Sequence, residues 1–101
     1  MNILGLPTHD LFHVKIRSGA LTVAATATEI KSDTTVLALR KGFILYNNSA
    51  VTMWIGDSSV TLTSGIPVLA GETVQVDAGP NCAWYAVVST STGNARVIEG
   101  Y

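Results

Sequence analysis

Apolar and polar residues alternate with a period of two along most of this chain, which indicates β-strands rather than helices. Phe12, Val14 and Ile16 alternate with polar residues. Leu21 and Val23 begin a second run of the same kind. Valine and threonine are frequent, and their branched side chains favour strands. Turn-forming residues recur at intervals of roughly 8–12 positions, a rhythm typical of a sandwich or barrel.

The pattern predicts roughly eight to ten short strands and no helix. We expect a turn at Ser18-Gly19 and another at Asn47–Ser49. Pro67 lacks a backbone donor, so its segment should lie at a sheet edge or bulge, whereas the apolar runs 43–46 and 82–89 should be central. A hairpin is expected at 91–94. The predicted strands cover residues 12–17, 21–28, 35–39, 43–46, 51–55, 60–63, 66–69, 73–76, 82–89 and 95–99.

The expected fold is a single-domain, all-β antiparallel β-sandwich, jelly-roll-like, with a closed barrel as the alternative. Residues 12–101 form this domain, and residues 1–11 form an extended N-terminal arm. The arm is apolar, but Gly5 and Pro7 interrupt it. Because exposed apolar chain reduces solubility, we expect the arm to fold back on its own sheet or to dock on a neighbouring subunit or a shell. A disordered arm is the third alternative.

The chain carries few charges, and this limits the kinds of partner it can bind. Charged residues make up 13% of the sequence and the net charge is −1, against a usual charged share of about 25%. A surface with few ions loses little when another protein covers it. The basic residues are scattered, and only Arg40 and Lys41 are adjacent, in an expected solvated turn. These features argue against nucleic-acid binding.

No segment has the features of a membrane span or a secretion signal. No run reaches the roughly 18 apolar residues of a membrane helix. The first ten residues carry no positive charge of the kind that begins a signal peptide. Cys82 is the single cysteine, so an internal disulfide is excluded, in keeping with assembly in a reducing cytoplasm. We expect Cys82 to be a small buried apolar residue.

Residues with catalytic or metal-binding chemistry are sparse. His9-Asp10-x-x-His13 is the one cluster with metal-ligand chemistry, but an extended chain would separate its two rings. Asp57, Glu72 and Asp77 fall in predicted turns, where local hydrogen bonds favour acidic residues. No nucleophile, phosphate-loop or dinucleotide motif is present. We therefore predict no enzyme activity, no catalytic residue, no cofactor and no metal.

Aromatic residues leave one binding function open. Trp54, Trp84, Tyr46 and Tyr85 are the candidates for a platform on which sugar rings stack. Trp84 and Tyr85 are neighbours in a predicted strand and should therefore point to opposite faces. A carbohydrate-binding module with Trp54 or Trp84 as the stacking ring remains an alternative, although Trp54 fits the rim of a core better.

Several short motifs follow one another in a recognisable order. A Thr/Ala-rich strand and an arginine precede an aliphatic strand with an Asn-rich turn. An aromatic-Ile-Gly turn, a Gly-Ile-Pro segment, a Gly-Glu turn and a closing strand follow. Over about residues 20–101 the chain resembles small virion structural proteins of tailed bacteriophages, above all head decoration (cement) proteins. The matching segments are residues 21–28, Arg40, 43–49, Trp54-Ile55-Gly56, Val60-Thr61, Gly65-Ile66-Pro67, Gly71-Glu72 and 95–99.

The resemblance implies a non-enzymatic capsid decoration protein that binds and stabilises the head shell. Its partners would be the major capsid protein and copies of itself in a homotrimer. It would be located on the capsid surface of the virion after assembly in the bacterial host cytoplasm. A tail, baseplate or fibre-associated subunit is the alternative within this class, and weak glycan binding at the surface stays open. The candidates for subunit or capsid contact are Ile3, Leu4, Leu6, Leu11 and Phe12.

Overall fold

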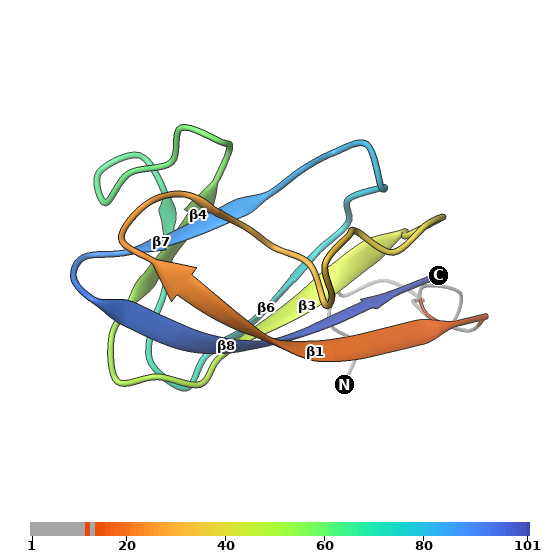
Figure 1. The fold of residues 1–101 in the computed structure, drawn as a ribbon, viewed down its shortest axis with the longest axis horizontal. Helices are drawn as coiled ribbons and strands as arrows, with labels where there is room; N and C mark the ends of the chain where they lie inside the picture. The colour runs from red at the N-terminus through yellow and green to blue at the C-terminus, as the bar shows by residue number, and fades with distance from the viewer. Residues whose placement is uncertain (1–11, 13) are drawn as a thin grey trace.

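The computed structural model describes Phe12 and residues 14–101, and all regular secondary structure in this part is β (Figure 1). The alternating segments form eight strands. No helix occurs among the described residues. The strands are β1 (Ile16–Ala24), β2 (Thr28–Glu29), β3 (Gly42–Asn47), β4 (Met53–Gly56), β5 (Ile66–Val68), β6 (Thr73–Val76), β7 (Tyr85–Val88) and β8 (Thr92–Gly100).

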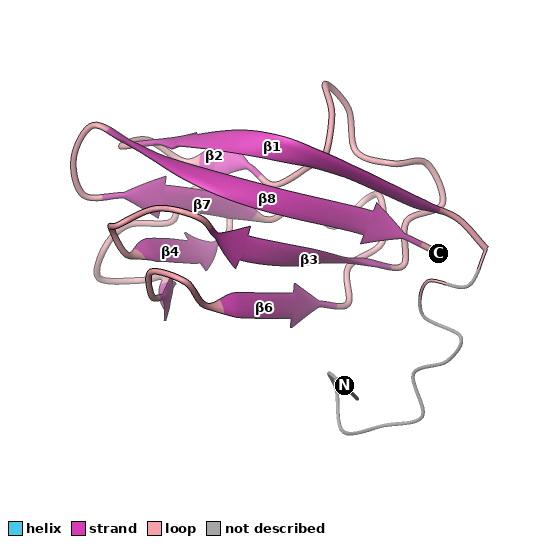
Figure 2. Ribbon diagram, turned by 90° about the horizontal axis from the view of Figure 1, so that it is seen from below, coloured by secondary structure: helices cyan, strands magenta, loops and turns pink. Residues whose placement is uncertain are grey.

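The strands form two four-stranded antiparallel sheets. Sheet A has the order β1-β8-β3-β6, and sheet B has the order β2-β7-β4-β5. Strands far apart in the sequence therefore pair. The first pairs with the eighth, the second with the seventh and the third with the sixth, while β4 and β5 close the series. Figure 2 shows the long pair β1 and β8 side by side.

The hydrophobic core lies between the two sheets, which gives a sandwich-like arrangement. Alternate residues of each strand point inward, as the period of two predicts. Sheet A contributes Phe43 and Leu45 from β3, and sheet B contributes Met53 and Ile55 from β4. The other buried members of the core are Val23, Ile30, Val68, Ala78, Ala86, Val88, Ala95 and Val97. The expected all-β antiparallel domain is thus confirmed.

Strand β1 differs from the prediction because it passes straight through Ser18-Gly19 without a turn. Gly19 permits this, since a Cβ there would lie 2.0 Å from the carbonyl oxygen of Ser32. The continuous strand also reverses the expected faces before Gly19. Arg17 shares the inner face with Leu21, whereas Ile16 is 58% exposed.

Other strand predictions divide into confirmed and wrong ones. Strands β3 and β7 are interior, β5 with Pro67 is an edge, and Val74 and Val76 pack against the core, all as expected. The predicted strands at 35–39 and 60–63 are turns and bends instead. The expected hairpin at 91–94 is also wrong, because β7 and β8 belong to different sheets and β8 crosses over to pair with β1 and β3.

Gly19→Ala is expected to destabilise the domain by about 1–3 kcal/mol, because the new methyl group would push the Ser32 backbone off β1. Gly79→Ala is the matched control, since the nearest atom to a Cβ there is 3.8 Å away. Urea unfolding followed by tryptophan fluorescence measures both. Equal stability of the two variants would contradict the close approach of the Ser32 carbonyl.

Candidate interaction surface

A carboxylate that is closed off from solvent lies beneath one end of sheet A. Glu99 is in β8, and its side chain is 0% exposed. Its Oε1 accepts hydrogen bonds from Nη2 of Arg17 (2.8 Å) and from both the backbone N–H (2.7 Å) and the hydroxyl (2.7 Å) of Ser32. Its Oε2 accepts from Nη1 of Arg40 (2.9 Å) and from the backbone N–H of Leu37 (3.2 Å). These donors fully occupy the carboxylate.

Arg40 is the buried cation of this cluster, at 2% exposure. Besides Glu99, its guanidinium donates to backbone carbonyls, so all five of its N–H donors are used. The guanidinium carbon of Arg40, Cζ, lies 5.4 Å from the centre of the Phe43 ring. The expected solvated turn at Arg40-Lys41 is therefore wrong for Arg40, although Lys41 is exposed. The acceptor carbonyls belong to Ile30 (3.3 Å), Ala78 (2.9 Å), Gly79 (3.1 Å) and Cys82 (3.0 Å).

The environment of Glu99 holds its carboxyl in the charged form. Burial acts to raise the pKa of Glu99. The hydrogen bonds from Ser32, Arg17 and Leu37 outweigh burial, and the resulting pKa lies below the ordinary value of 4.5. A fully enclosed carboxylate that stays ionised neither reaches a substrate nor exchanges a proton near neutral pH. The cluster is therefore structural, and it joins the 30–41 segment to β1 and β8.

The segment held by this cluster presents Leu39 to solvent. Leu39 is 69% exposed and has a φ of 65°. The left-handed conformation costs a residue with a Cβ about 1–2 kcal/mol. A large apolar side chain that is exposed in such a conformation contributes no favourable burial to the free energy of folding. A conformational outlier of this kind points to a functional constraint.

Three further apolar residues lie at the same end of sheet A. Val14 is 65% exposed and its N–H donates to the Tyr101 carbonyl (2.7 Å). Ile16 is paired with Gly100, and a Cβ on Gly100 would lie 2.7 Å from the Phe12 ring. The Gly100 carbonyl also accepts from the N–H of Lys41 (2.8 Å), two residues after Leu39. Phe12, Val14, Ile16 and Leu39 are called here the Gly100 surface.

Of the residues predicted to contact a partner, Phe12 lies on the Gly100 surface. The described residues do not include the other four candidates, Ile3, Leu4, Leu6 and Leu11. They also do not include His9, Asp10 and His13, the cluster with metal-ligand chemistry in the sequence. Among the residues that the structure does describe, no group of three or more His, Cys, Asp or Glu side chains could hold a metal ion. The structure adds Val14, Ile16 and Leu39 to the candidates. Of these three, Val14 and Ile16 carried a signal in the sequence, because the alternation placed them with Phe12 on one face of a predicted strand.

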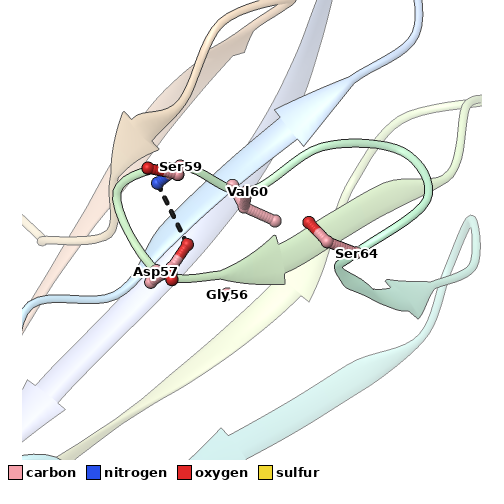
Figure 3. A pocket seen from close by; sticks show the side chains of 5 residues that line it. All are labelled: Gly56, Asp57, Ser59, Val60 and Ser64. Carbon is pink, nitrogen blue, oxygen red and sulfur yellow. Dashed lines mark hydrogen bonds between the residues drawn. The ribbon is translucent and has the colours of Figure 1, made fainter.

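A separate hollow of about 320 Å³ lies at the end of β4 and the loop that follows it. Gly56, Asp57, Ser59, Val60 and Ser64 line it (Figure 3). Its polar groups already bond within the loop. Oδ1 of Asp57 accepts the Ser59 N–H (3.0 Å), and Oγ of Ser64 accepts a backbone N–H. This pattern is that of a loop closed by its own turns, and it presents no paired acid and base.

The aromatic residues and the cysteine are placed differently from one another. Trp84 packs against the core and meets Phe43 edge to face, with ring centres 6.3 Å apart. Trp54 lies between the inward-facing Met53 and Ile55, so it points to the outer face of sheet B. The two tryptophans thus cannot form one platform. Cys82 is exposed, so the expectation of a buried cysteine is wrong.

Comparison with known proteins leaves the family open. No protein-family model matches the chain, and no curated protein matches it. The described part of the chain contains no helix long and apolar enough to cross a membrane.

Arg40→Met is expected to lower the free energy of unfolding by about 3–5 kcal/mol, because it leaves the buried Glu99 charge without its buried partner. Lys41→Met, a change of the same kind at the exposed neighbour, should alter it by less than about 0.5 kcal/mol. Thermal and urea unfolding give both values. If Arg40→Met lowered the free energy of unfolding as little as Lys41→Met, the ion pair between Arg40 and Glu99 would not be what stabilises the fold.

Stability should fall as the pH drops below about 4.5, because the lowered pKa of Glu99 means that the unfolded chain takes up the proton first. The contribution of Glu99 is complete above its unfolded pKa and is lost as the pH falls through its folded pKa. The slope from this group approaches about 1.4 kcal/mol per pH unit.

The measurement is urea unfolding at a series of pH values from neutral to strongly acidic. Glu99→Gln should be less stable at neutral pH and should lose less stability on acidification than the unchanged chain. Parallel pH profiles for the two proteins would exclude Glu99 as the source of the acid sensitivity.

Proposed function

We propose that this chain is a non-enzymatic structural protein of a tailed-phage virion, most specifically a capsid decoration protein that binds and stabilises the head shell. The observation that carries the proposal is the order of the strands, β1-β8-β3-β6 and β2-β7-β4-β5. Nested pairing of first with last strand is the order expected of a jelly roll. Jelly rolls form many viral capsid and lectin domains. The strand order thus supports a jelly roll as the fold, and a capsid-type or lectin-type protein as the class.

The residues that carry the resemblance to phage proteins contact one another in this fold. Arg40 pairs with Glu99 of the closing strand. The Asn-rich turn meets the Gly-Glu turn, because the Asn47 N–H donates to the Glu72 carbonyl (2.9 Å) and the Gly71 N–H donates to the Asn47 carbonyl (2.9 Å). These contacts make the motifs parts of one structural unit. They therefore support a resemblance in fold rather than a chance match of short sequence motifs.

A second contact within this set joins the aromatic turn to the Gly-Ile-Pro segment. A Cβ on Gly65 would lie 2.7 Å from Cβ of Trp54, so only glycine permits this approach. Asn47 extends the unit, since its buried side chain donates to the carbonyl of Val68 (2.9 Å) in the other sheet. The sequence pattern thus corresponds to points where distant turns are joined.

The Gly100 surface is the part of the molecule best suited to contact the shell or neighbouring subunits. It exposes three large apolar side chains, and the candidates Ile3, Leu4, Leu6 and Leu11 precede it in the sequence. The low charge of the whole sequence keeps the desolvation cost of such a contact small. In this proposal the partners are the major capsid protein and copies of the chain itself in a homotrimer, on the capsid surface of the virion.

A lectin-like function is less well supported. Trp84 is partly buried and packs against the core, which leaves Trp54 and, diagonally across from it on β7, Tyr85 as the aromatic rings on the outer face of sheet B. The hollow at the end of β4 has its polar groups bonded within its own loop. A tail, baseplate or fibre-associated subunit would share the fold and the surface, so location on the particle separates it from the decoration function.

The binding test uses head shells that lack this chain, mixed with the purified protein and sedimented. Leu39→Asn should bind at least about tenfold more weakly, because an apolar anchor is lost. The same variant should be more stable by about 1 kcal/mol, since asparagine tolerates the left-handed backbone better than leucine. Loss of binding together with a gain in stability cannot arise from misfolding.

Leu62→Asn is the matched control, because it makes the same change at an exposed leucine away from the Gly100 surface and outside the left-handed region. It should bind like the unchanged chain. Deletion of residues 1–11 should leave a folded domain that no longer binds. Retained binding by both Leu39→Asn and the truncated chain would contradict the proposed surface, and failure of the unchanged chain to bind any shell would contradict decoration.

A further inference from the structure

Strand β1 is an edge strand that the fold leaves long. The described part of the chain has four edge strands, because β1 and β6 end sheet A while β2 and β5 end sheet B. β6, β2 and β5 have four, two and three residues, and β5 also contains Pro67. β1 has nine residues. Short length, proline and charge are the features that keep an edge from pairing with another chain, so β1 is the edge that is open to pairing.

The hydrogen bonds between β1 and β8 show which backbone groups of β1 point away from the sheet. Lys15 and Tyr101 exchange two backbone hydrogen bonds (2.8 and 2.9 Å). Such pairs recur at every second residue of an antiparallel ladder, so the odd-numbered residues of β1 bond to β8 and the even-numbered ones face outward. At the end of β1, the Ala24 N–H donates to Oγ1 of Thr28 (3.0 Å). The outward-facing residues whose N–H and C=O groups have no partner among the described residues are Ile16, Ser18, Ala20 and Thr22.

The side chains of these four residues do not protect the edge. All four are exposed, none is charged and three are small. Their backbone groups form a row about 20 Å long, at roughly 3.4 Å per residue. An extended backbone presents donors and acceptors at the same spacing, which is how a peptide adds to a sheet edge. The chemistry of this edge therefore fits an extended peptide segment.

The surroundings of Gly19 favour a segment of another protein over a second copy of β1. Antiparallel pairing of two β1 strands through all four outward-facing residues would place the two Gly19 residues opposite each other. The Ser32 carbonyl lies against Gly19, and the connection between β2 and β3 rises past β1 in Figure 2. Two copies would bring two of these connections to the same point. A segment of another protein brings no second connection with it.

We propose that the head shell contributes an extended segment that adds to β1 as a fifth strand of sheet A. This inference rests on the proposed function and states which part of the shell the protein recognises. The open edge begins at Ile16, which is also a member of the Gly100 surface. Apolar contacts at the Gly100 surface and backbone hydrogen bonds along β1 thus form one continuous interface with the shell.

Hydrogen exchange of single backbone amides tests this pairing on the full chain bound to head shells that lack it. The amides of Ser18, Ala20 and Thr22 should exchange at least about tenfold more slowly on the shell than in the free protein, because the added strand accepts their hydrogen bonds. The Leu21 amide already bonds to β8 and should change less. Thr73 on β6, the other edge of sheet A, is the control and should exchange equally in both samples. Quenched exchange read by mass spectrometry with single-residue fragmentation gives these rates.

A proline on the edge gives an independent check. Ala20→Pro removes an N–H that has no partner within the described fold, and edge strands tolerate proline at such positions. This variant should fold but bind shells at least about tenfold more weakly. Thr73→Pro is the matched control, because it makes the same kind of change at the first residue of β6, where the N–H also faces away from the neighbouring strand. Equal binding of the two variants would contradict pairing through β1.

The exchange data separate failure of this inference from failure of the proposed function. If the unchanged chain binds shells but Ser18, Ala20 and Thr22 exchange as fast as in the free protein, pairing through β1 is wrong and decoration stands. Failure of the unchanged chain to bind any shell would overturn both. Slow exchange of these three amides in concentrated protein without shells would show that a second copy covers β1, and it would also overturn the inference.

Discussion

The carboxylate of Glu99 is the point on which the rest of this structure depends. It is fully enclosed, and a buried charge must be paired and hydrogen-bonded to be tolerated. Its partners come from β1 through Arg17, from the 30–41 segment through Ser32, Leu37 and Arg40, and indirectly from residues 78–82 through the guanidinium of Arg40. Two strands of sheet A and the two longest connections between the sheets therefore come together at one charge.

This cluster links the interior to the surface proposed for function. By holding the 30–41 segment against β8, it keeps Leu39 exposed in a left-handed conformation, two residues before the Lys41 N–H that donates to the Gly100 carbonyl. A small domain without a disulfide has little stability to spare, so strain and exposed apolar area persist only when the surrounding structure enforces them. A partner that covers the surface would recover the apolar burial and stabilise the fold by mass action.

The sequence alone predicted the all-β class, the central strands and the edge at Pro67, because a period of two and the missing proline donor are local properties. The sequence did not predict features that depend on contacts between residues far apart along the chain. Arg17 and Arg40 lie 82 and 59 residues from Glu99 along the chain, so nothing near them indicated burial. The turn expected at Ser18-Gly19 failed for the same reason, since Gly19 is explained by the Ser32 carbonyl packed against it. Leu39 had no local signal at all.

Immunogold labelling of the source virions with antibody to this chain tests the central claim most directly, since that claim is that the chain is a capsid decoration protein. Decoration predicts gold spread evenly over the heads in electron micrographs. Gold confined to the tail or its tip would replace decoration with the tail-associated function, while the fold and the Gly100 surface would still apply. Particles that carry no gold at all would contradict the virion assignment itself.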